Sequence, residues 1–163
     1  MTRRAAIETG IVSAAEVAAV TGAEVEKVKS WCARSAKSYS PVTQNMHVTD
    51  AVAYCLHFAP RPKLCAIRMP IGTTALIFDD ARALKIMRWS VYCNKAIRHV
   101  LKLVSKGDLL QHSAPVKVTT HGYSVRIKDF DARLHQALTL LGKACRCSIG
   151  DVFVWCIHIF KEN

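Results

Sequence analysis

The chain has 163 residues, enough for one domain of ordinary size or for two to three small modules. Apolar residues make up 51% of it, which allows a buried core and argues against wholesale disorder. Lysine and arginine number 23 against 12 acidic residues, giving a formal net charge of +11. An excess of this size is evidence about partners rather than about fold, and it makes polyanions, nucleic acid first among them, the expected partners.

The chain also has seven cysteines. Its basic start, Met1–Glu8, is not followed by the apolar stretch of a signal peptide, and no apolar run reaches membrane-spanning length. We therefore expect reduced thiols in a cytoplasmic protein without a membrane partner. Cys145, Cys147, Cys156 and His158 have donor atoms suited to zinc, but residues two apart on a helix point about 200° apart. The sequence thus predicts no metal site and no cofactor.

The first motif is a helical hairpin over residues 14–33. Ser13, with Glu16 three residues later, has the spacing of a capping box at the start of a short helix. Gly22 supplies a tight turn, where a residue without Cβ is favoured. Trp31 belongs to the apolar stripe of a second helix.

This pattern resembles the helix-turn-helix of phage and plasmid repressors, whose second helix lies in the major groove of DNA. The resemblance implies a DNA-reading module over residues 1–37. The cationic and polar residues of its second helix that would face the groove are Lys27, Lys29 and Ser30. Glu24 and Glu26 lie beside them and oppose phosphate, and an ordinary αα-hairpin with the same apolar pattern is the alternative.

A central module is expected over residues 46–110, beginning with a short helix at Thr49–Phe58. Lys63–Met69 alternates loosely in polarity, and Thr74–Phe78 is β-branched and aromatic. Pro70, Ile71 and Gly72 between them have the character of a turn, so the sequence predicts a β-hairpin.

A long basic helix is then predicted from Asp79 to Val104, with Gly107 just past its end. Its apolar stripe predicts a buried face. On another side lie the residues Lys85, Arg88, Tyr92, Lys95, His99 and Lys102. Because this stripe has one sign and its cations repel one another, we expect it to contact phosphates, with a solvated face as the alternative. Tyr92 is expected either to stack on a base or to cover a lysine stem.

The C-terminal module, residues 114–163, begins with a strand at Ser124–Lys128 that alternates apolar with polar or cationic residues. A helix is expected at Asp129–Leu141, ended by Gly142, and Ser148 is expected to cap a last helix.

This order resembles, over residues 123–162, the ribbon-helix-helix fold of the Arc and MetJ repressor class. In that family two chains pair their strands into one ribbon that enters the major groove. The resemblance implies that Ser124, Arg126 and Lys128 face base edges. In the alternative, Val116–Thr120 pairs with this strand inside the chain, through a turn at His121 and Gly122.

The last helix is apolar almost all round, so it must be buried deeply or in a partner. We expect a homodimer with Phe153, Trp155, Ile157 and Phe160 at its interface. The chain has none of the common catalytic or nucleotide-binding signatures, and an enzyme is not expected.

The sequence therefore predicts a helix-rich α+β protein: a sequence-specific, double-stranded-DNA-binding transcriptional regulator of phage, plasmid or bacterial type. The alternative is an RNA-binding structural protein, such as a ribonucleoprotein subunit or a viral nucleic-acid packaging protein, which Glu24 and Glu26 favour. A protein-interaction adaptor that uses the apolar last helix is a third hypothesis.

Overall fold

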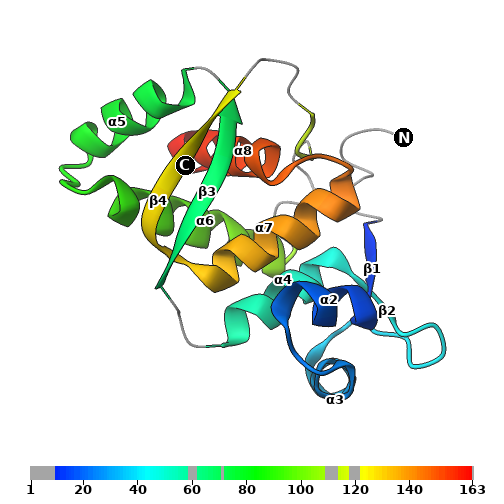
Figure 1. Cartoon of the computed structure of the whole chain (residues 1–163). Helices are drawn as coiled ribbons and strands as arrows, with labels where there is room; N and C mark the ends of the chain where they lie inside the picture. The colour runs from blue at the N-terminus through cyan, green and yellow to red at the C-terminus, as the bar shows by residue number, and fades with distance from the viewer. Residues whose placement is uncertain (1–9, 59–61, 71, 109–113, 118–121, 163) are drawn as a thin grey trace.

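The computed structural model describes five stretches of the chain, residues 10–58, 62–70, 72–108, 114–117 and 122–162. Within them the chain is a helix-rich α+β protein with two small antiparallel sheets, so the predicted fold class is confirmed at this level (Figure 1). The paired strands are β1 (Ile11–Ser13) with β2 (Asn45–His47), and β3 (Pro62–Pro70) with β4 (Gly122–Asp131).

The N-terminal hairpin forms as its local signals predict, from α2 (Ala14–Thr21) and α3 (Val25–Ser35). The Ser13 hydroxyl accepts from the Glu16 N–H at 3.1 Å, and the Glu16 carboxylate accepts from the Ser13 N–H at 3.4 Å, which confirms the capping box. Gly22 ends α2 at φ +76°, a conformation that residues with a Cβ rarely adopt.

The next helix, α4 (Val48–His57), agrees with the predicted helix at Thr49–Phe58 to within one residue. The His47 side chain caps it by accepting from the Thr49 N–H. The helix lies at the centre of the fold, where it contacts α3, α6 and α7.

The predicted central β-hairpin is wrong. Residues 74–78 lie in a helix, α5 (Thr73–Ala83), and β3 pairs instead with β4 from the C-terminal part of the chain. Thr73, Ile77 and Ala81 are buried at intervals of four residues, which is a helical spacing. This periodicity outweighs the β-propensity of the threonines, isoleucine and phenylalanine. Ile71, in the predicted turn, lies outside the described residues.

The predicted single helix from Asp79 to Val104 is also wrong, because it is divided into α5 and α6 (Trp89–Ser105). The Lys85 N–H donates to the Arg82 carbonyl at 3.0 Å, and the Ile86 N–H donates to the Ala81 carbonyl at 2.9 Å. Lys85 itself has φ +57°. Together these are a Schellman helix end, with lysine where glycine is usual.

The last two helices are α7 (Ala132–Cys145) and α8 (Ile149–Glu162). The prediction that Gly142 ends α7 is wrong. The helix continues to Cys145, and its C-cap is Arg146, which has φ +59°. Gly142 is buried, and a Cβ there would lie 2.8 Å from the Cys147 carbonyl oxygen of the returning chain. Glycine at position 142 therefore allows this close approach of the chain, and it does not end the helix.

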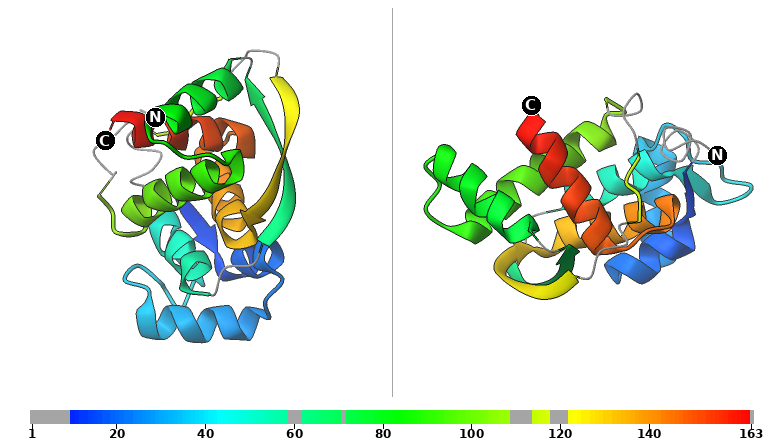
Figure 2. Two further views of the ribbon diagram at one scale, coloured as in Figure 1. Left: turned by 90° about the vertical axis from the view of Figure 1, so that its left-hand side faces the viewer. Right: turned by 90° about the horizontal axis from the view of Figure 1, so that it is seen from above.

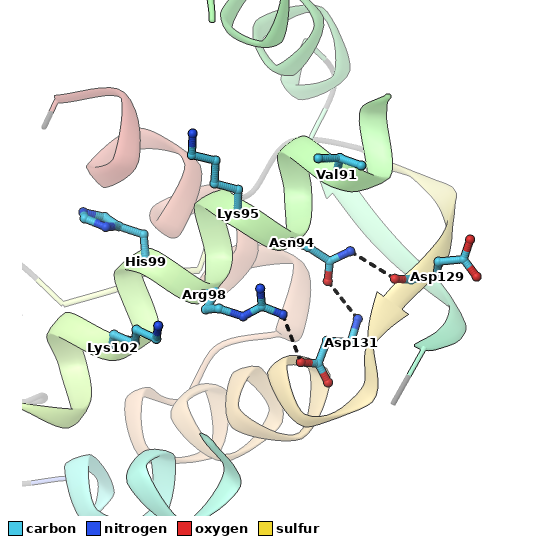
Figure 3. A pocket seen from close by; sticks show the side chains of 8 residues that line it. All are labelled: Val91, Asn94, Lys95, Arg98, His99, Lys102, Asp129 and Asp131. Atoms are coloured by element: carbon cyan, nitrogen blue, oxygen red, sulfur yellow. Dashed lines mark hydrogen bonds and ion pairs between the residues drawn. The ribbon is translucent and has the colours of Figure 1, made fainter. Parts of the chain in front are cut away.

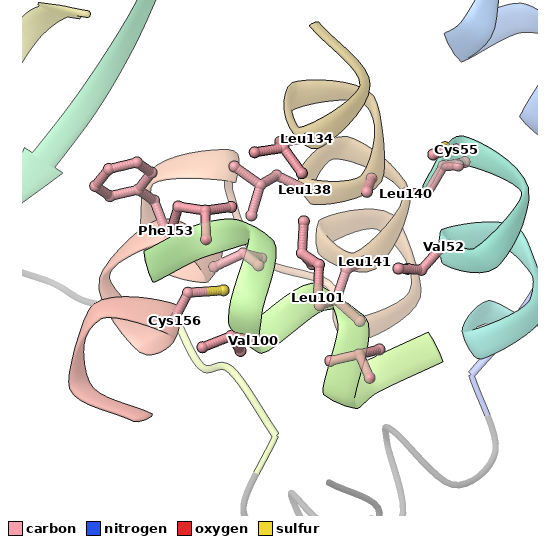
Figure 4. Packing of buried hydrophobic residues seen from close by; sticks show 14 of the residues in the cluster. Val52, Cys55, Val100, Leu101, Leu134, Leu138, Leu140, Leu141, Phe153 and Cys156 are labelled. Carbon is pink, nitrogen blue, oxygen red and sulfur yellow. The ribbon is translucent and has the colours of Figure 1, made fainter. Parts of the chain in front are cut away.

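One hydrophobic cluster runs from Val12 to Ile159 and includes residues of all three predicted modules. Figure 4 shows its centre, where leucines of α7 meet side chains of α4, α6 and α8. The β3–β4 ribbon covers one face of these helices (Figures 1 and 2).

The expected dimer interface is not available on α8. Phe153 and Ile157 are 0% exposed inside the chain, and Trp155 and Phe160 are partly buried against the same core. The helix is buried because α6, α7 and β3 contact it, so its apolar character needs no second chain. Of the alternative strand at Val116–Thr120, residues 118–120 lie outside the described residues, as does His121. No helix among the described residues has the length and apolarity needed to cross a membrane.

Candidate nucleic-acid interface

The predicted basic stripe of the central helix is divided by the break between α5 and α6. Lys85 lies in the turn between the two helices and Arg88 is the N-cap of α6, while Lys95 and Lys102 are exposed along α6 itself. The prediction for Tyr92 is wrong. Its side chain is 0% exposed and its hydroxyl donates to the Asp80 carboxylate, so the ring stacks on no ligand. Burial and this hydrogen bond raise the pKa of Tyr92 well above its usual value.

A groove of about 510 Å³ lies between α6 and the end of β4 (Figure 3). Asn94 fixes its shape: the side-chain amide donates to the Asp129 carbonyl at 3.0 Å and accepts from the Asp131 N–H at 2.9 Å. The cationic side chains that line the groove from α6 are Lys95, Arg98 and Lys102, with His99 beside them.

Arg98 also lines this groove, although the sequence pattern did not indicate it as a binding residue. Its Nη2 lies 3.3 Å from Oδ2 of Asp131, and the buried Arg133 binds the same oxygen at 2.9 Å. Arg133 also donates to the Leu56 carbonyl at 2.9 Å, so it is held inside the fold. Two guanidinium groups thus share one carboxylate, and the half-exposed Arg98 contributes positive charge to the groove. Asp129, exposed at the groove wall, contributes negative charge there in addition to Asp131.

The β3–β4 ribbon has one apolar and one cationic face. Cys65, Ile67 and Met69 of β3 and Ile127 of β4 are nearly or fully buried against the helices. The residues of β4 on the other face are Ser124, Arg126 and Lys128, all exposed as predicted for a half-buried strand.

On β3 the exposed face includes Ala66 and Arg68. The strand register sets Arg126 opposite Ala66 and Ser124 opposite Arg68. Arg68 was not predicted as part of this face, because the sequence pattern indicated the wrong partner segment for β3.

The α3 residues of the predicted set lie elsewhere. Lys29 forms an ion pair with Glu26, with a distance of 3.2 Å between Nζ and Oε1. Lys27 and Ser30 line a separate hollow between α3 and the end of α4. The predicted nucleic-acid-binding residues therefore do not form one site. Apart from Lys29, which pairs with Glu26, and the buried Tyr92, they divide among this hollow, the α6 groove, the ribbon and the α5–α6 turn.

Burial keeps the cysteine thiols protonated. All the cysteines have free thiols, and burial raises the pKa of Cys32 to about 11 and that of Cys55 to about 12. Among the residues that the structure describes, no group of histidine, cysteine and acidic side chains could hold a metal ion.

Comparisons with known proteins identify no relative: the chain matches no family model, no curated protein and no solved structure.

Proposed function

We propose that the protein binds duplex DNA through the outer face of the β3–β4 ribbon and the adjoining α6 groove, as a regulator of phage, plasmid or bacterial type. The observation that carries this proposal is the two-faced ribbon. Its inner face is buried in the core, whereas Arg68, Arg126 and Lys128 are exposed on its outer face. A two-stranded antiparallel ribbon is narrow enough to enter the major groove, where arginine and lysine can bind guanine edges.

The α6 groove supports the proposal because it adjoins β4 and adds cations beside the ribbon. Lys95 and Lys102 are exposed, and Arg98 shares its carboxylate with Arg133. Such residues suit contact with phosphates, which hold a protein in register on DNA, while the ribbon side chains would contact bases.

The α2–α3 hairpin supports the regulator class. Its helices have 8 and 11 residues and are joined at Gly22 by a turn over residues 22–24, which agrees with the short turn of a helix-turn-helix. α3 lies at the end of the molecule away from α5 (Figures 1 and 2). Reading of DNA by Lys27, Lys29 and Ser30 stays a prediction.

Binding of labelled duplex DNA, single strands and structured RNA across a salt series tests the proposal. We expect duplex affinity to fall with salt, with a log–log slope of about −0.9 for each phosphate neutralised. Lys95→Ala and Lys102→Ala should each flatten this slope by roughly one contact, whatever the sequence. Arg126→Ala should instead relax site preference by about 1–3 kcal/mol for a lost base contact.

The matched control is Lys143→Ala, which removes an exposed lysine on α7 outside the groove and the ribbon. It should leave the slope unchanged. A salt slope near zero, or equal effects of all four variants, would overturn the proposal.

The second candidate function is an RNA-binding structural protein. The observation that favours it is the group of aromatic rings between α3 and α4, since such rings stack on unpaired bases. Tighter binding to single-stranded or structured RNA than to duplex DNA in the same series would select this candidate.

A further inference from the structure

A hollow of about 670 Å³ lies between α3 and the C-terminal end of α4, away from the ribbon and the α6 groove. Four rings meet at it. The centroid distances are 5.2 Å for Trp31–Tyr54, 5.8 Å for Trp31–His57, 5.0 Å for Tyr54–Phe58 and 5.2 Å for His57–Phe58. The hollow thus has an aromatic wall built from two helices.

The rings differ in exposure. Tyr54 is 2% exposed and anchors the group in the core, whereas Phe58 is 47% exposed. Trp31 is partly exposed and His57 is exposed. The exposed phenyl ring of Phe58 and the partly exposed indole of Trp31 line one concave surface, and both rings contact Tyr54 and His57. They provide apolar faces on which a planar ligand can stack.

The rim of the hollow has charges of both signs. Lys27 and Arg34 contribute positive charge, and Glu24 and Glu26 contribute negative charge. Glu26 is paired with Lys29 at 3.2 Å, and Arg34 donates through Nε to the Ser30 carbonyl at 3.2 Å.

This balance selects the ligand class. A lone phosphate would face the carboxylate of Glu24, and a lone ammonium group would face Lys27 and Arg34. A neutral planar ring with both donors and acceptors on its edge suits this rim, because the rim also offers both. Nucleobases have these properties.

We propose that this hollow binds one unpaired nucleobase of a nucleic-acid strand, stacked on the rings of Trp31 and Phe58. The base must be unpaired because a paired base hides its faces in the helical stack. The inference rests on the proposed function for its class of ligand, but it uses residues outside the ribbon and the α6 groove.

Fluorescence anisotropy with three labelled DNA duplexes tests this site. One duplex is fully paired, one has a single unpaired thymidine, and one has an abasic residue at the same place. We expect the unpaired base to bind tighter than the abasic residue by about tenfold to a hundredfold, as one stacked base does elsewhere. The second arm of the experiment repeats the measurement with RNA duplexes that have one unpaired nucleotide at the same place. A preference for the base over the abasic residue in either DNA or RNA supports the proposal, and it identifies which nucleic acid supplies the base.

Phe58→Ala should abolish the preference for the base over the abasic residue. Because this ring is about half exposed, its removal should leave the core intact, and the melting temperature checks this. The matched control is Phe78→Ala, which removes a ring that is 54% exposed on α5 and contacts Trp89. The control should keep the preference.

Equal affinity for the base and the abasic residue in wild type would overturn the proposal, as would an unchanged preference in folded Phe58→Ala. These failures are distinct from failure of the proposed function. Salt-dependent duplex binding without a base preference removes the hollow alone, and a base preference without duplex binding removes the ribbon proposal alone.

Discussion

Asp131 combines three roles in one buried carboxylate. It caps α7 by accepting from the Arg133 N–H at 3.0 Å, it pairs with the Arg133 guanidinium at 2.9 Å, and it holds Arg98 at 3.3 Å. Its side chain is 3% exposed. Through these contacts one residue at the end of β4 fixes the start of α7 and positions a cation of the groove.

We predict that Asp131→Ala destabilises the protein by about 3–5 kcal/mol, because it leaves the buried guanidinium of Arg133 without its charge partner. Urea unfolding followed by circular dichroism measures this loss. Asp108→Ala, which removes an exposed acid after α6, is the control and should change the free energy of unfolding by about 0.5 kcal/mol or less. A loss below about 1 kcal/mol for Asp131→Ala would contradict the assigned role.

Side-chain interactions between residues close in the sequence could be predicted, whereas those between residues far apart in the chain could not. The capping boxes at Ser13 with Glu16 and at Ser148 with Asp151 are both present, because donor and acceptor lie three residues apart. Arg98 depends on Asp131, far along the chain, so its own neighbours gave no sign of that contact.

At the scale of the elements, β3 and α8 approach each other closely at Gly150. A Cβ on this residue would lie 1.7 Å from the carbonyl oxygen of Arg68, a backbone atom that cannot turn aside. The first turn of α8 therefore lies directly against the strand whose outer face has Arg68. Glycine at this position lets the ribbon sit on the helices.

We predict that Gly150→Ala destabilises the protein by about 3 kcal/mol or more, because α8 or β3 has to move away from the core. Gly22→Ala is the matched comparison. It has φ +76° but nothing within 4 Å of the added Cβ, so only about 1–2 kcal/mol of backbone strain is expected. Thermal unfolding of both variants measures the difference, and equal losses would show that the close approach is easily relaxed.

The ends of helices explain why the bounds of α5, α6 and α7 were predicted wrongly. α5 and α7 end with Lys85 and Arg146 in left-handed conformations, at φ +57° and +59°. Because long cationic residues are rare there, neither position signalled a stop, and the break before α6 was missed. The helix at Val48–His57 has clear breakers beyond it and was predicted almost correctly.

At the scale of the molecule, contacts between distant parts of the chain decide what covers the ribbon and the last helix. β3 pairs with β4, and α8 is covered by α6, α7 and β3, so the ribbon and the apolar last helix are completed within one chain. The apolar pattern of α8 showed that this helix must be buried, but it did not show which elements cover it. That is why the sequence predicted a second chain where the fold supplies its own partner.

The shared core predicts that the N-terminal hairpin does not unfold separately from the rest. Val17 on α2 is 0% exposed and belongs to the same cluster as the helices of the C-terminal half, and α2 contacts α7. Val17→Ala removes two buried methyl groups and should cost about 2 kcal/mol. Because the unit is cooperative, we expect this loss in the unfolding of every helix and not of α2 and α3 alone.

Two probes in one urea titration check this expectation. Circular dichroism reports all the helices, and fluorescence of Trp31 reports α3 in a background with Trp89→Phe and Trp155→Phe. The two curves should coincide, and Val17→Ala should move both to lower urea by the same amount. Val42→Ala, at a residue that is 92% exposed, should move neither. Two separate transitions, with Val17→Ala shifting the Trp31 signal alone, would instead show an independent N-terminal module, as a self-contained helix-turn-helix over residues 1–37 requires.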